Sequence, residues 1–477
     1  MSSISAGIHL SQAVAPKDSS WLIEKLFIID GNTTSEPSTH APIPSSNTPD
    51  DLSLHSRDAN DDSILIQRGI ITDRGPHALL KERHPEVPVV DGTGYMVYPG
   101  LVNGHTHCAM GFFRGLGHGV DQMIQRLFFP VESSLDETMI ESLSLGYMLS
   151  GLQSGVTFFA DHYYFVAGVG RALDRLGMRG AIAETIADRG GAHPSYASFE
   201  RAQRHLDRWP HSSRVRPAAG PHATDTVSLQ LLKEVAQWAR HHQLPVHMHL
   251  GQTSLEWAAA QSHQKTPVAL AADAGLLSDR TLVVHLLHRT EEDLMLLGHT
   301  GTTVGVCPSS QIIYERLTDL TSLDKNALPL VIGTDCAASS DHCNVLDELR
   351  TFALLSKDRQ CAPEFYSPKK LFAMATDHAY RVFCPELSIG SIRPGQAADL
   401  VFSPIDVSLL PLHEPLTNLI YSAASKNVKH VMIDGRWVLW DGQPVLISLE
   451  TISQEYKTAV ARIHQLCGHL FSPHTSP

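Results

Sequence analysis

Two histidines close a short apolar run near residue 100. The run Tyr95–Val102 leads through Asn103 and Gly104 to His105, Thr106 and His107. Side chains two positions apart on a strand lie on the same face, so this strand, if it lines a barrel, directs both imidazoles at one metal ion. The chain contains 28 histidines, so the pair needs ligands from other strands to count as a metal site.

Further metal-binding residue types stand at the ends of other apolar strands. His249 ends the segment 244–249, His285 ends 281–285, and Asp335 follows 329–334. A single polar residue at a strand end is ordinarily a solvated terminus. The repetition over four strands predicts one metal site made of His105, His107, His249 and Asp335.

Three imidazoles and a carboxylate suit Zn²⁺, with Fe²⁺ as the alternative. A divalent ion lowers the pKa of bound water from about 15.7 to about 7, which yields a hydroxide nucleophile at neutral pH. Asp335 is placed to accept the proton of that water as well as to touch the metal. His285 would hold the attacked atom or stabilise the oxyanion that forms.

The elements between these residues alternate between strands and helices. Eight strand–helix units predict an α/β fold, a (β/α)₈ barrel whose working residues lie at the carboxyl ends of the strands. Helical runs such as Thr138–Leu152 and Leu229–His241 lie between strands. The strands expected are 95–102, 155–160, 179–184, 215–220, 244–249, 281–285, 303–306 and 329–334.

Short β-strands flank the barrel on both sides in sequence. We expect residues 20–96 and 386–446 to form one small β-sandwich around the barrel of residues 97–385, which requires the two ends of the chain to meet. Residues 31–62 are rich in Ser, Thr, Pro, Asn and Asp and predict a flexible loop. A closing helix and tail occupy 447–477.

Composition restricts the partners. The formal net charge is −13 and no run of Lys or Arg is present, which argues against nucleic acid. The seven cysteines lack CxxC spacing and predict reduced thiols of a cytoplasmic protein. No apolar run reaches the roughly 18 residues that span a bilayer, and no signal peptide begins the sequence. We expect a small-molecule substrate.

The sequence resembles the amidohydrolase superfamily, in the branch of S-adenosylhomocysteine/methylthioadenosine deaminases and s-triazine chlorohydrolases. The resemblance covers about residues 20–445 and implies a barrel with a sandwich from both termini, a mononuclear zinc site and a homo-oligomer. It implies metal ligands at His105, His107, His249 and Asp335, a catalytic His285, and a substrate contact from His222. The motifs are PGLVNGHTH with GFFRGL, SGVTFFAD, GPHATDT, HMHLGQT, GTDCAASS with LDELR, and IGSIRPGQAADLVF.

One catalytic position departs from the family. The family places a Glu three residues after the third metal-binding histidine, where it carries a proton from the metal-bound water to a ring nitrogen. Here that position is Gln252, whose amide has no acidic proton to give and no charge to accept one. Either the substrate needs no ring protonation, another group supplies the proton, or the protein is not a deaminase.

Two substrate-binding positions depart as well. Counting back from Asp188 puts the substrate-facing Arg of the deaminases at Glu184. This carboxylate either pairs with an Arg such as Arg189 or turns to the pocket, where it binds a cationic group or replaces the missing acid. Counting back from Glu132 puts the ribose-binding acid at Gln122. Without that acid, a compact amine-bearing heterocycle or amidine is favoured over an adenosine-type substrate.

Three further residues have two interpretations. His247 is expected to pack in the core, although it is two residues before His249. Glu256 shares a face with Gln252 if that stretch is helical and would then be a stand-in acid. His162 either reaches the pocket mouth or is a polar residue at a strand end.

The leading hypothesis is a zinc-dependent hydrolase of carbon–nitrogen bonds other than peptide bonds. It displaces ammonia, an amine or another leaving group from an amidine-like carbon of a nitrogen heterocycle, with Asp335, His285 and Gln252 in the catalytic site. Glu184, His222 and Gln122 are the expected substrate-binding residues. The alternatives are a catalytically silent relative that binds a ligand, motivated by Gln252, and non-hydrolytic metal-assisted chemistry.

Overall fold

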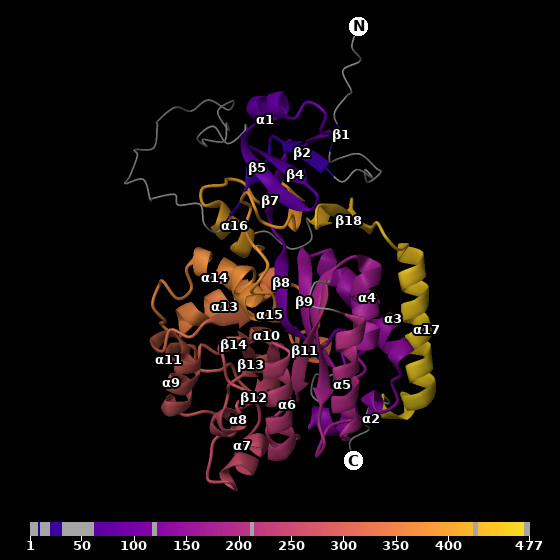
Figure 1. Cartoon of the computed structure of the whole chain (residues 1–477), viewed down its shortest axis with the longest axis vertical. Coiled ribbons are helices and arrows are strands. Elements are labelled where there is room, and N and C mark those ends of the chain that lie inside the picture. The colour runs from indigo at the N-terminus through magenta and orange to yellow at the C-terminus, as the bar shows by residue number, and fades with distance from the viewer. Residues whose placement is uncertain are drawn as a thin grey trace.

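A computed structural model describes residues 8–9, 20–30, 62–116, 122–209, 214–422 and 428–471. The predicted flexible loop lies outside the described residues, except for Asp62. The fold is α/β, with an eight-stranded parallel sheet and two smaller sheets. In Figure 1 the small sheets lie above the barrel, and the yellow helix α17 (Leu449–Cys467) runs down the side of the barrel beside α3 (Glu137–Leu152). The predicted barrel and accessory β-sheets are confirmed.

The parallel strands form the barrel in sequence order. Their residues are buried and mainly apolar, because both faces of the sheet are covered. Helices cover the outer face, and side chains fill the inside of the barrel. The strands are β8 (Leu101–Thr106), β9 (Val156–Tyr163), β10 (Arg179–Ile186), β11 (Val215–Pro221), β12 (Val246–Leu250), β13 (Thr281–His285), β14 (Thr303–Val306) and β15 (Leu330–Ile332).

The barrel closes where its last strand returns to its first. The backbone N–H groups of Thr334 and Asp335 donate to the carbonyl of His105 at 3.1 and 3.0 Å. The Asn103 side chain also bonds Thr334, at 2.7 Å to its hydroxyl. Gly104 is required at this seam, because a Cβ there would lie 1.9 Å from a methyl carbon of Val331. The closure therefore fixes His105 next to Asp335.

The helices connect and cover these strands. Several begin with a side-chain cap, as where Asp136 accepts from the backbone N–H groups of α3 at 2.9 Å. The barrel helices are α3, α4 (Ala167–Leu176), α5 (Ala197–Arg208), α6 (Leu229–His241), α7 (Ser254–Gln261), α8 (Pro267–Ala274), α9 (Glu291–Thr300), α10 (Pro308–Tyr314), α11 (Leu320–Lys325), α12 (Ala337–Ser340), α13 (Val345–Asp358), α14 (Pro368–Met374) and α15 (Asp377–Phe383).

Short helical elements lie outside this pattern. None of the helices among the described residues is both long and apolar enough to cross a membrane. The short elements are α1 (His77–Arg83), the 3-10 helices η2 (Cys108–Phe113) and η5 (Gly468–Leu470), the π-helix η3 (Ile124–Phe128), α2 (Phe129–Glu132) and α16 (Pro415–Tyr421).

The two small sheets bury an apolar core between them that includes Trp21, Phe402, Trp437 and Trp440. One sheet holds β1 (Ile8–His9), β6 (Val89–Asp91), β2 (Ser20–Glu24), β4 (Asp62–Gln67) and β5 (Ile70–Pro76). The other holds β19 (Gln443–Pro444), β18 (Arg436–Trp440), β17 (His430–Ile433), β16 (Leu400–Pro404), β7 (Tyr95–Pro99) and β3 (Phe27–Ile28).

The apolar run 95–102 is two strands and not the single strand expected. Residues 95–99 form β7, which pairs antiparallel with β16 from the C-terminal part of the chain. The chain then passes through Gly100 into β8 of the barrel. The N-terminal and C-terminal parts of the chain thus share one sheet, as expected, and that sheet leads directly into β8, the strand that carries His105.

A buried ion pair joins the barrel to this sheet. Arg179, at the start of β10, is 6% exposed and donates through Nε to Asp399 at 2.7 Å, and it also pairs with Asp434. Asp399 precedes β16, and Asp434 lies between β17 and β18. A single barrel cation therefore engages two carboxylates of the accessory sheet.

Replacing Asp399 tests how much this ion pair contributes to the stability of the fold. Asp399→Ala should lower stability by about 3 kcal/mol, because removing one partner of a buried pair leaves charge without full compensation. The measurement is the shift of the urea unfolding midpoint. Asp377→Ala is the matched control, since its ion pair with Arg381 is at the surface and should be worth less than about 1 kcal/mol. Equal shifts for the two variants would contradict the prediction.

Candidate active site

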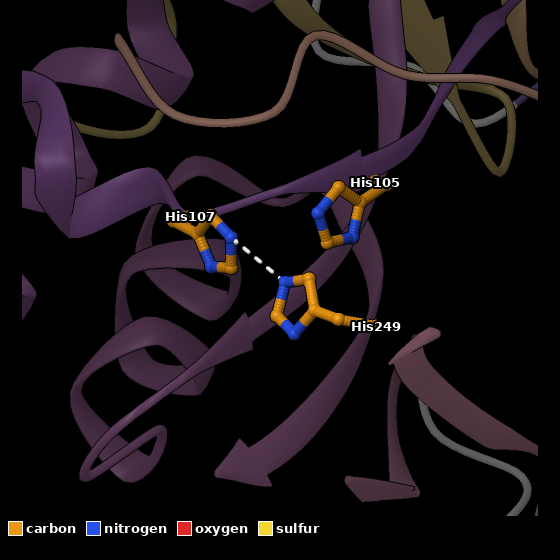
Figure 2. A group of neighbouring side chains, drawn as sticks. All are labelled: His105, His107 and His249. Atoms are coloured by element: carbon orange, nitrogen blue, oxygen red, sulfur yellow. Dashed lines mark hydrogen bonds between the residues drawn. The ribbon is translucent and has the colours of Figure 1, made fainter. Parts of the chain in front are cut away.

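The four expected metal ligands converge at one end of the barrel. His107 Nε2 lies 3.3 Å from His249 Nε2 and 3.3 Å from Asp335 Oδ1, and His105 Nε2 lies 3.6 Å from the same oxygen. Figure 2 shows the rings of His105, His107 and His249 turned toward one another. Ligand atoms about 2.0–2.1 Å from a tetrahedral zinc ion are about 3.3–3.4 Å apart. The donor set therefore fits one such ion.

The other ring nitrogen of each histidine is held by a second group. Nδ1 of His107 bonds the carbonyl of His162, and Nδ1 of His249 lies 3.2 Å from the carbonyl of His222. A carbonyl only accepts, so both rings carry their proton on Nδ1 and leave Nε2 free for a metal. Nδ1 of His105 lies 2.8 Å from His247 Nε2. His247, expected to be a packing residue, thus contacts a ligand directly.

Asp335 is held as a carboxylate. Its Oδ2 accepts from the Ser310 hydroxyl at 2.6 Å and its Oδ1 from the Cys336 backbone N–H at 2.8 Å. Burial raises the pKa of Asp335, but hydrogen bonds with His105 and His107 outweigh that effect and hold the pKa well below its ordinary value. Its φ of +58° is a strained conformation for a residue with a side chain.

His285 lies beside this group at the end of β13. Its ring stacks on His249 with centroids 5.5 Å apart, and its Nε2 is buried without a hydrogen-bond partner among the described residues. Burial lowers the pKa of His285 to about 3, so the ring is neutral. His105, His285 and Asp335 also offer ligand atoms within 4.8 Å of one another. His285 is therefore a neutral ring whose Nε2 can form a hydrogen bond or approach an ion.

A cavity of about 80 Å³ opens beside these groups. Of the expected substrate and catalytic residues, His222 and Gln252 line it. So does His162, because β9 extends to Tyr163 and not only to residue 160 as expected. The lining residues are His107, Met110, Ile124, Phe128, Phe129, Glu132, His162, Tyr163, Tyr164, Thr185, His222, His249, Gln252, Tyr314, Asp335 and Cys336.

Glu184 does not face the cavity, which corrects the substrate-binding interpretation. Thr185 lines the cavity, and the preceding side chain on β10 points to the opposite face. The Glu184 carboxylate accepts from Arg201 at 2.9 Å and from the backbone N–H groups of Phe165 and Val166 at 3.1 and 3.0 Å. It is the paired carboxylate of the alternative interpretation, with Arg201 in place of Arg189.

Gln122 also lies outside the cavity lining. It is exposed, adopts a φ of +50° and precedes the π-helix η3. Its neighbour Asp121 is outside the described residues. The structure does not place Gln122 at the site where a ribose-binding residue was expected.

Gln252 and Glu256 occupy the loop and first turn of α7. The Gln252 backbone N–H donates to the Glu256 carboxylate at 2.9 Å, and the Thr224 hydroxyl donates to it at 2.8 Å. Burial raises the pKa of Glu256 to about 7. Glu256 is not among the lining residues, so it supports the loop that carries Gln252 and does not itself reach the cavity.

Sequence reasoning missed Glu132 as a site residue. It lines the cavity from the end of α2 and is 5% exposed. The segment Pro130–Glu132 follows no strand, so the rule that working residues lie at strand ends did not reach it. Its apolar neighbours Phe128, Phe129 and Val131 were the available signal, because a carboxyl within an apolar run is buried or functional.

Known proteins are similar to this chain in sequence. Residues 96–438 match the model of the amidohydrolase family. The 5-methylthioadenosine/S-adenosylhomocysteine deaminase of Nitratidesulfovibrio vulgaris (strain Hildenborough) is 30% identical over 84% of this chain and 92% of its own.

Two solved structures resemble the chain over almost its whole length. An adenosine deaminase of Xanthomonas campestris with bound zinc has a TM-score of 0.81 at 26% identity and covers 93% of this chain and 98% of its own. The atrazine chlorohydrolase of Arthrobacter aurescens with zinc has a TM-score of 0.78 at 21% identity, over 92% and 100% of the two chains, which shows the shared fold. The chain therefore belongs to the amidohydrolase family and is a hydrolase of that family.

Proposed function

We propose that this hydrolase is a zinc-dependent aminohydrolase that displaces ammonia or another leaving group from an amidine-like carbon of a nitrogen heterocycle. The convergence of three histidine Nε2 atoms and Asp335 Oδ1 beside a cavity carries the proposal. The deaminase relatives and a neighbour crystallised with zinc support the reaction type and the metal.

His105, His107, His249 and Asp335 would hold the ion. Bound zinc would supply a Lewis acid that makes a water molecule acidic near neutral pH. Asp335 is ionised and therefore able to receive the proton of the attacking water. His285, neutral and unpartnered at Nε2, is placed to bind the oxygen that joins the substrate carbon.

The cavity favours a compact, flat substrate. Phe128, Phe129, Tyr164 and other aromatic residues line it, and flat heterocycles stack on such rings. His222, whose Nδ1 lies 2.8 Å from the Thr226 hydroxyl, presents its ring to this space. The exposed position of Gln122 supports a substrate that needs no ribose clamp.

The function is tested by ammonia release from a defined panel. The panel contains methylthioadenosine, S-adenosylhomocysteine, adenosine, guanine, an amino-substituted pterin and aminated triazines. The reaction is run in H₂¹⁸O. An aminohydrolase should release ammonia and place one ¹⁸O atom in the product. Turnover without ¹⁸O incorporation would favour non-hydrolytic chemistry.

Removing the metal should abolish turnover. Protein stripped with a chelator should lose more than about 100-fold of its ammonia-release rate, because no side chain among the described cavity residues can make water acidic near neutral pH as a metal ion does. Reloading with Zn²⁺ should restore the rate, as followed by metal analysis and kinetics on the same samples. Equal turnover by stripped and reloaded protein would contradict a metal-dependent reaction.

His247 should set the affinity for zinc through His105. His247→Phe removes the acceptor of the His105 Nδ1 proton, so zinc should bind about 10–100-fold more weakly. His247→Gln keeps an acceptor and should recover most of that affinity. Competition with a chromophoric chelator measures both variants, and unchanged affinity in His247→Phe would show that the contact is packing alone.

Gln252→Glu separates an adapted enzyme from a silent relative. A carboxylate here adds negative charge to a cavity that already contains Asp335 and Glu132, so an enzyme adapted to the amide should lose about tenfold or more in kcat/KM. The assay is ammonia release from the panel. A silent ligand-binding relative would instead gain deaminase activity.

A further inference from the structure

We propose that a second cavity, at the carboxyl end of β13, binds a phosphate dianion through Arg289, Arg316 and Arg359. This site goes beyond the proposed hydrolysis and does not depend on it. The cavity has a volume of about 270 Å³, close to the range of about 300–1000 Å³ that is typical of small-molecule sites. It shares no lining residue with the catalytic cavity.

The three arginines come from different parts of the chain. Arg289 precedes α9, Arg316 lies between α10 and α11, and Arg359 is the C-cap of α13. Figure 1 shows α9, α11 and α13 on the left of the barrel. The fold therefore brings three arginines from separate elements to one cavity.

Their positive charge is only partly compensated. Among the described residues that line the cavity, Asp319 carries the one carboxylate, and its Oδ2 lies 4.0 Å from Arg289 Nη2. Arg316 Nε lies 3.9 Å from Glu315, whose side chain is 45% exposed. In the part of the chain that the structure describes, no carboxylate pairs with Arg359. A cavity with three cations and one carboxylate attracts an anion.

Arg289 lacks a close counter-ion although it is largely buried. Its side chain is 11% exposed, and its Nε is buried with no hydrogen-bond partner among the described residues. Burial lowers the pKa of Arg289 below its ordinary value, and the charge of Arg316 lowers it further, despite the attraction of Asp319. A buried charge is costly without a partner, and an oxyanion in the cavity would be that partner.

Two further carboxylates act on Arg289 from outside the cavity. Glu291 and Asp293 belong to α9 and do not line the cavity. Glu291 accepts from the Ser322 hydroxyl at 3.1 Å, and Asp293 accepts from the Thr266 hydroxyl at 2.6 Å. Both carboxylates are thus bonded to other elements, so neither takes the place of an anion inside the cavity.

Phosphate is the oxyanion that suits this arrangement. A guanidinium group presents its N–H donors in a planar fork that matches two oxygens of a phosphate group. Three such groups can bind different oxygens of one tetrahedral dianion. A carboxylate offers only two oxygens and one negative charge, so it would compensate less of the positive charge.

The cavity is connected to the catalytic side through the segment after β13. His285 and Leu286 have φ values of +86° and +49°, which are strained for residues with a side chain. The Thr318 hydroxyl donates to the Leu286 carbonyl at 2.8 Å, and Arg316 donates to the Leu287 carbonyl at 3.4 Å. An anion that holds Arg316 in place therefore also holds the backbone that follows His285.

Arg359→Gln tests the site through the binding of inorganic phosphate to zinc-loaded protein, measured by isothermal titration calorimetry. The variant should bind phosphate about 10–100-fold more weakly, because a charge-assisted hydrogen bond is lost. Arg359 is exposed at a helix end, so the fold should tolerate the change. Arg204→Gln removes the same charge from the exposed face of α5. It is the matched control and should bind phosphate as the wild type does.

Hydrogen exchange locates the bound ion. Phosphate should slow the exchange of the backbone amides of residues 286–290 and 315–320 in the wild type, and this protection should be lost in Arg359→Gln. Protection confined to the ends of β8 and β12, with equal affinity in Arg359→Gln, would place the phosphate at the metal-binding group and overturn the site. The absence of binding to the wild type up to about 10 mM phosphate would also overturn it.

A comparison of ligands identifies the source of the phosphate group. Tighter binding of ribose 5-phosphate than of inorganic phosphate would assign a small organic phosphate, and the reverse order would assign the free ion. Sulfate should compete with either ligand, whereas acetate at the same concentration should not. Equal competition by acetate would overturn the assignment to a dianion. These measurements need no turnover, so a failure of the proposed hydrolysis would leave them unaffected.

Discussion

The orientation of three imidazole rings is the constraint on which the site depends. The Nε2 atom of each ring is available because Nδ1 of the same ring contacts a group of β12, of β9 or of the residue directly after β11. Two of these groups are backbone carbonyls, at His162 and His222, so the ring orientations are fixed by the register of the parallel sheet. A slip of one residue between strands would turn side chains to the other face and disperse the ligands.

The convergence of the four expected metal ligands could be predicted from sequence because the relevant signals are local. Residue type and the two-residue period of a strand are visible in His105 and His107, and a parallel barrel brings all its carboxyl strand ends to one rim. The division of the apolar run 95–102 into two strands was harder to predict. The break at Gly100 is set by distant partners, since β7 pairs with β16 and Leu101 of β8 pairs with Val156 of β9.

The direction of a buried carboxyl was not readable from the sequence either. Glu184 ended an expected strand, and its face depended on how far β10 continues and on Arg201 and His205, which follow on α5. Glu132 was difficult to predict as a cavity residue for a different reason, because it belongs to no strand and reaches the cavity from a short helix. In both cases the deciding quantity is which donors surround the carboxyl, and those come from other elements.

The connection from β7 through Gly100 to β8 affects when the expected metal site can form during synthesis of the chain. A Cβ at Gly100 would lie 2.1 Å from the Thr157 hydroxyl oxygen, so the chain turns from one sheet to the other in a tight space. The strand before it is completed only by residues 400–404. On a ribosome His105 and His107 therefore lack their supporting sheet until most of the polypeptide has emerged, and the expected metal site of a nascent chain takes shape late in synthesis.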